Sequence, residues 1–164
     1  QYKTYGRDVV LSSFVPAEER EDVLKLGAED LQRIRENITE NFLKTAEMYP
    51  DITFYLFFPP YSVCYWEALV RTGQLDATIE AQNAGVELLL SAENICLYDF
   101  SDRTDITGDL DNYTDSLHYG PWISSEILQM IRKDEGRLTL ENFEAYYDSV
   151  RKVYEEYDYT LYKN

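Results

Sequence analysis

The run Ile52-Thr53-Phe54-Tyr55-Leu56-Phe57-Phe58, which Pro59-Pro60 ends, decides the fold of this chain. A continuous stretch of β-branched and aromatic residues is typical of a strand buried on both faces, as the strands of parallel sheets are. A second such run covers residues 94–100, and the residues between the two runs show helical patterns over 63–70 and 75–90. Strands that alternate with helices predict a parallel βαβ unit and an α/β fold.

Helical patterns continue on both sides of this unit. Apolar residues recur at helical spacing over residues 29–48, which predicts an amphipathic helix. Pro121 is expected to open another helix, because proline is well suited to the first helical turn. Thr139 is expected to cap a last helix that runs from Leu140 toward Tyr157.

Residues 1–27 are expected to form an N-terminal extension or connector within a single domain that spans residues 1–164. The short apolar run over residues 8–14 predicts a strand, and an acidic connector follows it around residues 16–22. The chain begins at Gln1 rather than at Met, which favours a processed or excised part of a longer protein.

Composition and charge narrow the classes of function. With 164 residues, 45% of them hydrophobic, the chain is long enough to fold around one core. Its formal net charge of -16 opposes binding to nucleic acid or to anionic membranes, because both need clustered Lys and Arg. The longest apolar run, residues 54–60, is too short to span a bilayer, so the chain as given is expected to be soluble.

The only histidine, His118, lies in Asp115-Ser116-Leu117-His118, beyond the second predicted strand. Histidine is the usual proton shuttle near neutral pH, and a carboxylate can hold one of its ring nitrogens. Ligands of open parallel sheets gather beyond the carboxyl ends of the strands, where Pro59-Pro60-Tyr61-Ser62 and the loop over residues 101–119 would lie. The alternative is that Asp115 caps a loop or helix and that His118 is an ordinary surface histidine.

The order of these segments resembles a known family. A strand ending in Phe57-Phe58-Pro59-Pro60-Tyr61-Ser62, a helical stretch, the strand Asn94-Ile95-Cys96-Leu97-Tyr98-Asp99-Phe100 and then Asn112-Tyr113-Thr114-Asp115-Ser116-Leu117-His118-Tyr119 resemble the C-terminal half of SGNH/GDSL hydrolases. The chain is most similar to a bacterial envelope-associated branch, over about residues 29–131. This implies a three-layer α/β/α, flavodoxin-like fold with a parallel sheet, present as an incomplete half, and an extracytoplasmic location in the cell envelope.

The resemblance also implies roles for individual residues. In a Ser-His-Asp triad, His118 would be the base and Asp115 would orient it. The parent protein would be a serine esterase, deacetylase or O-acyltransferase that acts on acyl groups of envelope polysaccharide or on small esters, with no cofactor. Tyr61, Ser62 and Trp66 could line the substrate pocket; equally, Pro-Pro-Tyr-Ser could serve only to stop a strand and start a helix.

The family's nucleophile is not found in the sequence. It lies in a Gly-Asp-Ser or Gly-x-Ser segment, whereas Ser12 and Ser13 have no preceding glycine and no helix N-terminus directly behind them. We therefore expect an upstream half of the same protein, or a homo-oligomer partner, to complete the fold. The alternative is a non-catalytic module that keeps the fold and binds a partner or a glycan, since an incomplete sheet leaves an open edge.

No metal is expected. A calcium loop of the EF-hand type that starts at Asp109 would need Gly and Glu where the chain has Thr114 and Gly120, so a solvated acidic loop is favoured over a looser oxygen site. Zinc is disfavoured because Cys64 and Cys96 have the apolar neighbours of buried thiols. The C-terminal tyrosines are interpreted either as a carbohydrate-stacking surface or as half-buried flanks of a helix; they are Tyr146, Tyr147, Tyr154, Tyr157, Tyr159 and Tyr162.

Overall fold

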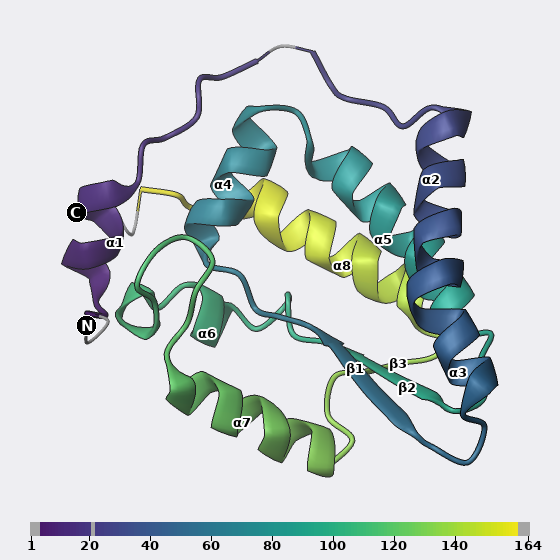
Figure 1. Ribbon diagram of the computed structural model, residues 1–164. Coiled ribbons are helices and arrows are strands. Elements are labelled where there is room, and N and C mark those ends of the chain that lie inside the picture. The colour runs from purple at the N-terminus through teal and green to yellow at the C-terminus, as the bar shows by residue number, and fades with distance from the viewer. Residues whose placement is uncertain (1–3, 21, 161–164) are drawn as a thin grey trace.

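A small mixed sheet lies at the centre of the computed structural model, which describes residues 4–20 and 22–160 (Figure 1). Its strands are β1 (Phe54–Phe58), β2 (Ile95–Asp99) and β3 (Arg137–Leu138), in the order β1-β2-β3. The β1 and β2 strands are parallel, whereas β3 is antiparallel to β2. The predicted α/β class and the parallel pair are therefore confirmed. The expected parallel sheet needs correction, because the described sheet is mixed, and the three-layer arrangement stays a prediction.

The register of the parallel pair brings the carboxyl ends of the two strands together. Phe54 lies opposite Ile95, and Phe58 lies opposite Asp99. The segment that follows Phe58 and the loop that follows Asp99 therefore start at the same edge of the sheet. This is the edge at which the sequence predicted a site.

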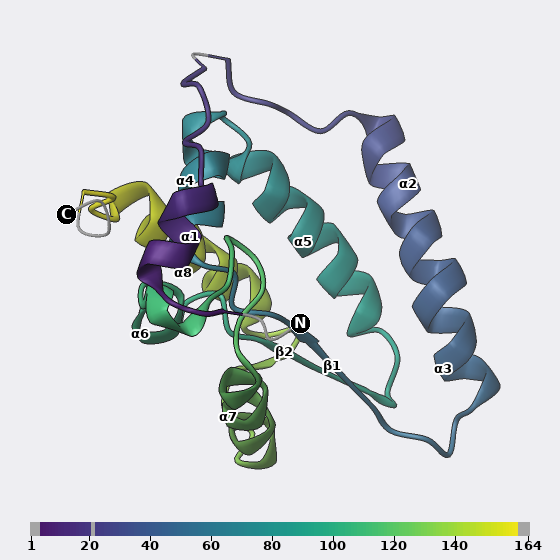
Figure 2. The same ribbon diagram turned by 60° about the vertical axis from the view of Figure 1, so that its left-hand side comes forward.

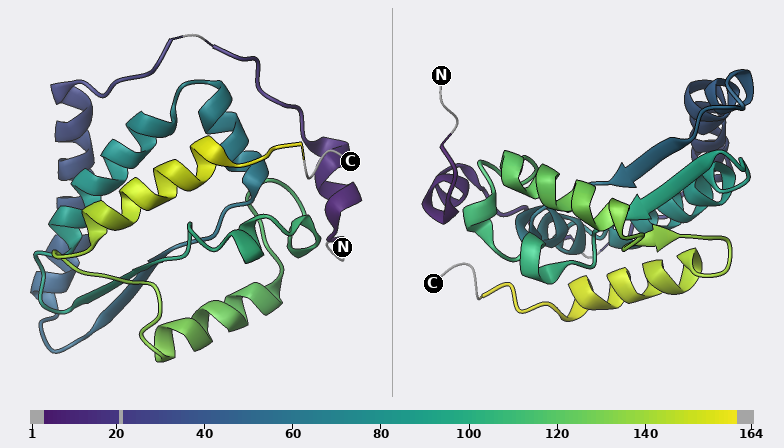
Figure 3. Two further views of the ribbon diagram at one scale, coloured as in Figure 1. Left: turned by 180° about the vertical axis from the view of Figure 1, so that it is seen from behind. Right: turned by 90° about the horizontal axis from the view of Figure 1, so that it is seen from below.

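Helices cover the two faces of β2 unequally. The helices α4 (Val63–Arg71), α5 (Leu75–Leu89) and α8 (Phe143–Glu156) share one core with Ile95 and Leu97 of β2. On the other face, Tyr98 packs in a second, smaller core with Ile123, Ile127 and Met130 of α7 (Pro121–Arg132). In Figure 3, left, α5 and α8 run side by side, and α7 lies across the strands from them.

The predicted amphipathic helix over residues 29–48 is confirmed as one continuous helical arm. It comprises α2 (Ala28–Ile38), a π-helical turn η1 (Thr39–Leu43) and α3 (Lys44–Met48). The arm packs mainly against α5, at the margin of the molecule (Figure 2). The C-terminal end of the arm is held by Asn94, whose side-chain amide donates to the carbonyl oxygens of Ala46 and Tyr49 at 3.0 and 3.1 Å.

The predicted strand over residues 8–14 is wrong, because these residues form the helix α1 (Arg7–Ser13). Val10 is fully buried in the main core, and Phe14, one helical turn later, packs against the same core. The spacing of four residues between them suits a helix. A run of seven residues was too short to distinguish the period of a helix from that of a strand. An extended segment then joins α1 to α2 and is held by the hydrogen bond from Leu24 N to Gly73 O at 2.8 Å.

Two further predictions need correction. The first strand is not buried on both faces, because the side chains of Tyr55 and Phe57 are 59% and 40% exposed. No helix of the described residues packs over them as α7 packs over Tyr98. The last helix starts at Phe143 rather than at Leu140, with Asn142 as its N-cap residue. Thr139 lies in the preceding turn, where its backbone N–H donates to Asn142 Oδ1 at 2.8 Å.

Candidate functional site

The candidate site lies on the loop between β2 and α7. This loop contains the short helical turns α6 (Thr104–Thr107) and η2 (Leu110–Asn112), and then a narrow turn closed by the bridge between Tyr113 and Tyr119. Inside that turn, Thr114 N donates to His118 O at 2.9 Å. The sequence Asp115 to His118 is therefore presented at the tip of a small, closed loop.

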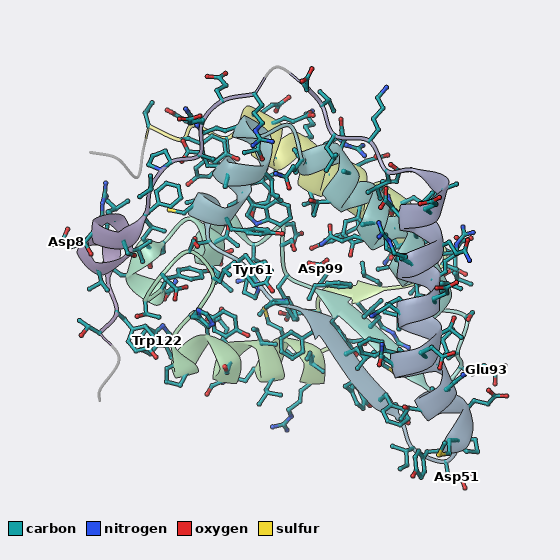
Figure 4. The ribbon with its side chains drawn as sticks, turned by 45° about the horizontal axis from the view of Figure 1, so that its top comes forward. Asp8, Asp51, Tyr61, Glu93, Asp99 and Trp122 are labelled. Carbon is teal, nitrogen blue, oxygen red and sulfur yellow. The ribbon has the colours of Figure 1, made fainter. Side chains whose placement is uncertain are left out.

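The loop is tied to the end of β1. The buried hydroxyl of Tyr113 donates to Pro60 O at 2.6 Å, and the Ser62 hydroxyl donates to Ser116 O at 2.8 Å. The two segments that the sequence placed at the carboxyl edge of the sheet are thus in contact. On the other side of the loop, Trp122 Nε1 donates to Asn112 Oδ1 at 2.9 Å. Figure 4 shows Trp122 at the start of α7, toward the side of the molecule where Asp8 of α1 lies.

The predicted contact between Asp115 and His118 is present. His118 Nδ1 lies 2.9 and 2.8 Å from the two carboxylate oxygens of Asp115. The carboxylate is itself fixed, because Oδ1 accepts the backbone N–H groups of Leu117 and His118 at 2.9 and 2.8 Å. Asp115 therefore caps the turn and also orients the His118 ring. The sequence analysis had given capping and contact with the histidine as alternative roles of Asp115, and the structure shows both.

The surroundings keep Asp115 ionised. Partial burial raises the pKa of its carboxyl, but the N–H groups of His118 and Leu117 and the His118 ring outweigh burial and lower the pKa below its ordinary value. A charged carboxylate on Nδ1 favours the proton on that nitrogen and leaves the lone pair on Nε2. The side chain of His118 is 62% exposed, and no group of the described residues is hydrogen-bonded to Nε2.

Ser62 and Trp66 are both buried, so neither side chain is open to solvent in this structure. Ser62 is fully buried and is the residue that precedes α4. Trp66 is 1% exposed and stacks on Tyr154 of α8, with ring centroids 4.2 Å apart and planes at 6°. Both side chains serve the strand end and the core. Tyr61 is half-buried against Tyr65 and is the only one of the three that is partly exposed.

The serines of α1 are not placed as nucleophiles. Ser12 Oγ donates to Val9 O at 2.8 Å, and Ser13 Oγ donates to Val10 O at 3.1 Å. Among residues 4–20 and 22–160, no serine hydroxyl is hydrogen-bonded to the His118 ring. A nucleophile for His118 would have to come from another segment or another polypeptide.

Sequence reasoning missed a buried carboxylate at the end of β2. Asp99 is fully buried, and its oxygens accept the hydroxyls of Tyr146 and Tyr147 at 3.0 and 2.8 Å and the N–H of Ser101 at 2.8 Å. Burial raises the pKa of Asp99 to about 6, although the hydrogen bonds from Ser101 and from the two tyrosines lower it. Asp99 is the last residue of β2 and Tyr61 follows the end of β1, both near the middle of the molecule (Figure 4).

The sequence favoured a solvated acidic loop that includes Asp99, Asp102, Asp105, Asp109 and Asp111, and this prediction is wrong for Asp99. The burial of Asp99 could have been predicted from its position as the last residue of a buried strand. The described residues contain no group of three or more His, Cys, Asp or Glu side chains arranged to hold a metal ion. Cys64 is buried as predicted, whereas Cys96 is only partly buried.

The C-terminal tyrosines mostly support the packing of α8. Tyr147 and Tyr154 are fully buried, and Tyr146, Tyr157 and Tyr159 are partly buried against the same core. Tyr162 lies outside the described residues. This arrangement matches helix flanks rather than a stacking surface for carbohydrate.

Comparisons of the chain with protein families, with curated proteins and with solved structures found no match. Within the described residues, no helix has the length and apolar character needed to cross a membrane.

Proposed function

We propose that this chain supplies the Asp-His pair of a serine esterase, deacetylase or O-acyltransferase that acts on acyl groups of cell-envelope polysaccharide. One observation carries the proposal: Asp115 contacts Nδ1 of an exposed histidine with both carboxylate oxygens, at the carboxyl edge of a parallel strand pair. The envelope location and the acylated carbohydrate substrate come from the resemblance to SGNH/GDSL hydrolases.

In this mechanism, His118 transfers a proton, and Asp115 stabilises the positive charge that His118 gains. Nε2 of His118 takes the proton of a serine hydroxyl while the serine oxygen attacks the acyl carbon. Asp115 stabilises the imidazolium that results. His118 then gives the proton to the leaving alcohol as the acyl-enzyme forms, and water or a sugar hydroxyl resolves that intermediate. The serine and the groups that bind the oxyanion would be supplied by polypeptide beyond the described residues.

The test uses a polypeptide in which this chain is joined to the segment that carries the serine. There, His118→Ala should lower kcat/KM for p-nitrophenyl acetate and for O-acetylated polysaccharide by about a thousandfold or more, because triad members act as a unit. Asp115→Asn should cause a large loss as well, because an amide does not stabilise the imidazolium.

Asp109→Asn is a matched control in the same loop. Asp109 also accepts a backbone N–H, that of Asp111 at 3.1 Å, and an asparagine oxygen can keep this hydrogen bond. We expect the control to retain its activity. Unchanged activity in His118→Ala would mean that Asp115 and His118 serve only to hold the loop.

The second candidate is a non-catalytic module that binds a partner or a glycan. Two observations favour this candidate. No serine hydroxyl of the described residues is hydrogen-bonded to the His118 ring, and the face of β1 that carries Tyr55 and Phe57 is exposed. In that case the longer polypeptide should show no esterase activity that depends on His118.

A further inference from the structure

The outer edge of β1 is unpaired. In the sheet order β1-β2-β3, β1 is an end strand, and no other described segment pairs with it. Phe54 N donates to Asn94 O at 2.8 Å, so the backbone groups of Phe54 face β2. Since backbone groups alternate in direction along a strand, those of Leu56 and Phe58 also face β2, and those of Tyr55 and Phe57 point outward.

Two side chains of this strand, those of Tyr55 and Phe57, also lack cover. Tyr55 and Phe57 project to the same face and line an open groove of about 850 Å³ together with Leu128 of α7. Leu128 is 61% exposed. Natural edge strands usually carry a lysine, a proline or a bulge that prevents pairing, and Phe54-Tyr55-Leu56-Phe57-Phe58 carries none of these. Figure 3, right, shows β1 on the side of β2 that is away from β3.

We propose that a second copy of this chain pairs with this edge, with the two β1 strands antiparallel and a two-fold axis at Leu56. In this register Tyr55 of each copy lies opposite Phe57 of the other, and Leu56 lies opposite Leu56. Tyr55 and Phe57 are the residues whose backbone groups point outward, so each such pair exchanges two hydrogen bonds. The register therefore satisfies every outward-pointing backbone group of Tyr55 and Phe57.

The strand is also self-complementary in its side chains. Antiparallel pairing at Leu56 sets aromatic rings opposite one another on both faces, Tyr55 against Phe57 and Phe54 against Phe58. No charged residue lies within the strand. A two-fold axis makes one sequence serve as both halves of the interface, so a second copy fits this edge without any further partner.

Net charge opposes this association. Each copy carries a formal charge of -16, so the two repel each other at low ionic strength. The Debye length falls to about 3 Å at 1 M salt, which screens this repulsion but leaves apolar contacts and backbone pairing in place. The dimer should therefore become tighter as salt is added, unlike an interface held by ion pairs.

The first experiment measures mass by sedimentation equilibrium at low and high salt. We expect the 164-residue chain to dimerise, more tightly at high salt, and Phe57→Lys to weaken the dimer at least tenfold. Leu128→Lys is the matched control: it adds the same charge to the same groove but not to the strand, and it should still dimerise. A wild-type monomer in both buffers, or an equal loss in both variants, would overturn the proposal.

The second experiment tests the register by oxidative cross-linking in a Cys96→Ser background. Directly opposite residues of a pair without hydrogen bonds have Cα atoms about 4.5 Å apart, so Leu56→Cys should form an intermolecular disulfide. Tyr55→Cys is the control, because its two copies are offset along the strands and lie too far apart for a disulfide. Cross-linking at Tyr55 but not at Leu56, with both variants folded by circular dichroism, would contradict the two-fold axis at Leu56.

Discussion

Asp99 is held in surroundings that favour its protonated form. Its carboxyl is fully buried between β2 and α8, and its pKa of about 6 lies above the ordinary value of 3.8. The folded state therefore binds this proton more tightly than the unfolded state does. The stability that comes from Asp99 is fully present below pH 3.8 and is lost as the pH rises through about 6.

Asp99→Asn should remove this dependence on pH. Between pH values of about 4 and about 7, the free energy of unfolding of the wild type should fall by about 2 kcal/mol relative to that of the variant. Urea unfolding at both pH values measures this difference, and Glu93→Gln provides a control in which a carboxyl outside the buried cluster is removed. A difference that does not change with pH would show that Asp99 stays charged in the folded protein.

Local spacing explains which site residues could be predicted. Asp115 and His118 lie within one turn of the chain, so the sequence alone could bring them together. The burial of Trp66 depends instead on Tyr154, far along the chain, which no local pattern reveals. The same is true of Asp99, because Tyr146 and Tyr147 reach it from α8.

At the scale of elements, α1 is held to the rest of the molecule by few contacts. Val10 is its only fully buried residue, and the backbone N–H of Arg7 donates to Asp111 Oδ1 at 2.9 Å. The helix has only seven residues, too few to be stable without tertiary packing. Val10 is therefore the main apolar contact of α1, and Leu11 and Phe14 add partly buried contacts with the same core.

Val10→Ala should release α1 from the core. The loss of buried methyl groups and the cavity left behind should destabilise the docked helix by about 2 kcal/mol. Hydrogen exchange measured by mass spectrometry should show faster exchange over residues 7–13 and little change in β2. Val15→Ala, at a position that is 84% exposed, is the control and should leave the exchange of α1 unchanged.

Elements with a long or uniform pattern could be predicted, and short ones could not. The helices over residues 28–48 and 75–89 and both parallel strands follow their apolar patterns. The strand β3 has two residues, so it carries no periodic signal, and it pairs only because the turn after α7 returns the chain to β2. The exposure of Tyr55 was missed because a run that is apolar at every position does not indicate which face is covered.

For the whole molecule, we expect Asp115 and His118 alone to catalyse little. The 164-residue chain should hydrolyse p-nitrophenyl acetate no faster than its His118→Ala variant, because no described serine contacts His118. A stopped assay with both proteins at equal concentration makes the comparison. Turnover that depends on His118 would instead identify a nucleophile within the chain, with Ser13 and Ser62 the first serines to replace.

The two tryptophans report on different parts of this molecule. Trp66 is enclosed in the main core against Tyr154, whereas Trp122 is 46% exposed beside the loop that carries His118. Trp66 should therefore emit at short wavelength and resist acrylamide quenching, while Trp122 should emit at longer wavelength and be quenched readily. Fluorescence of the unmodified protein can thus follow unfolding of the core and the arrival of a ligand at the loop as two separate signals.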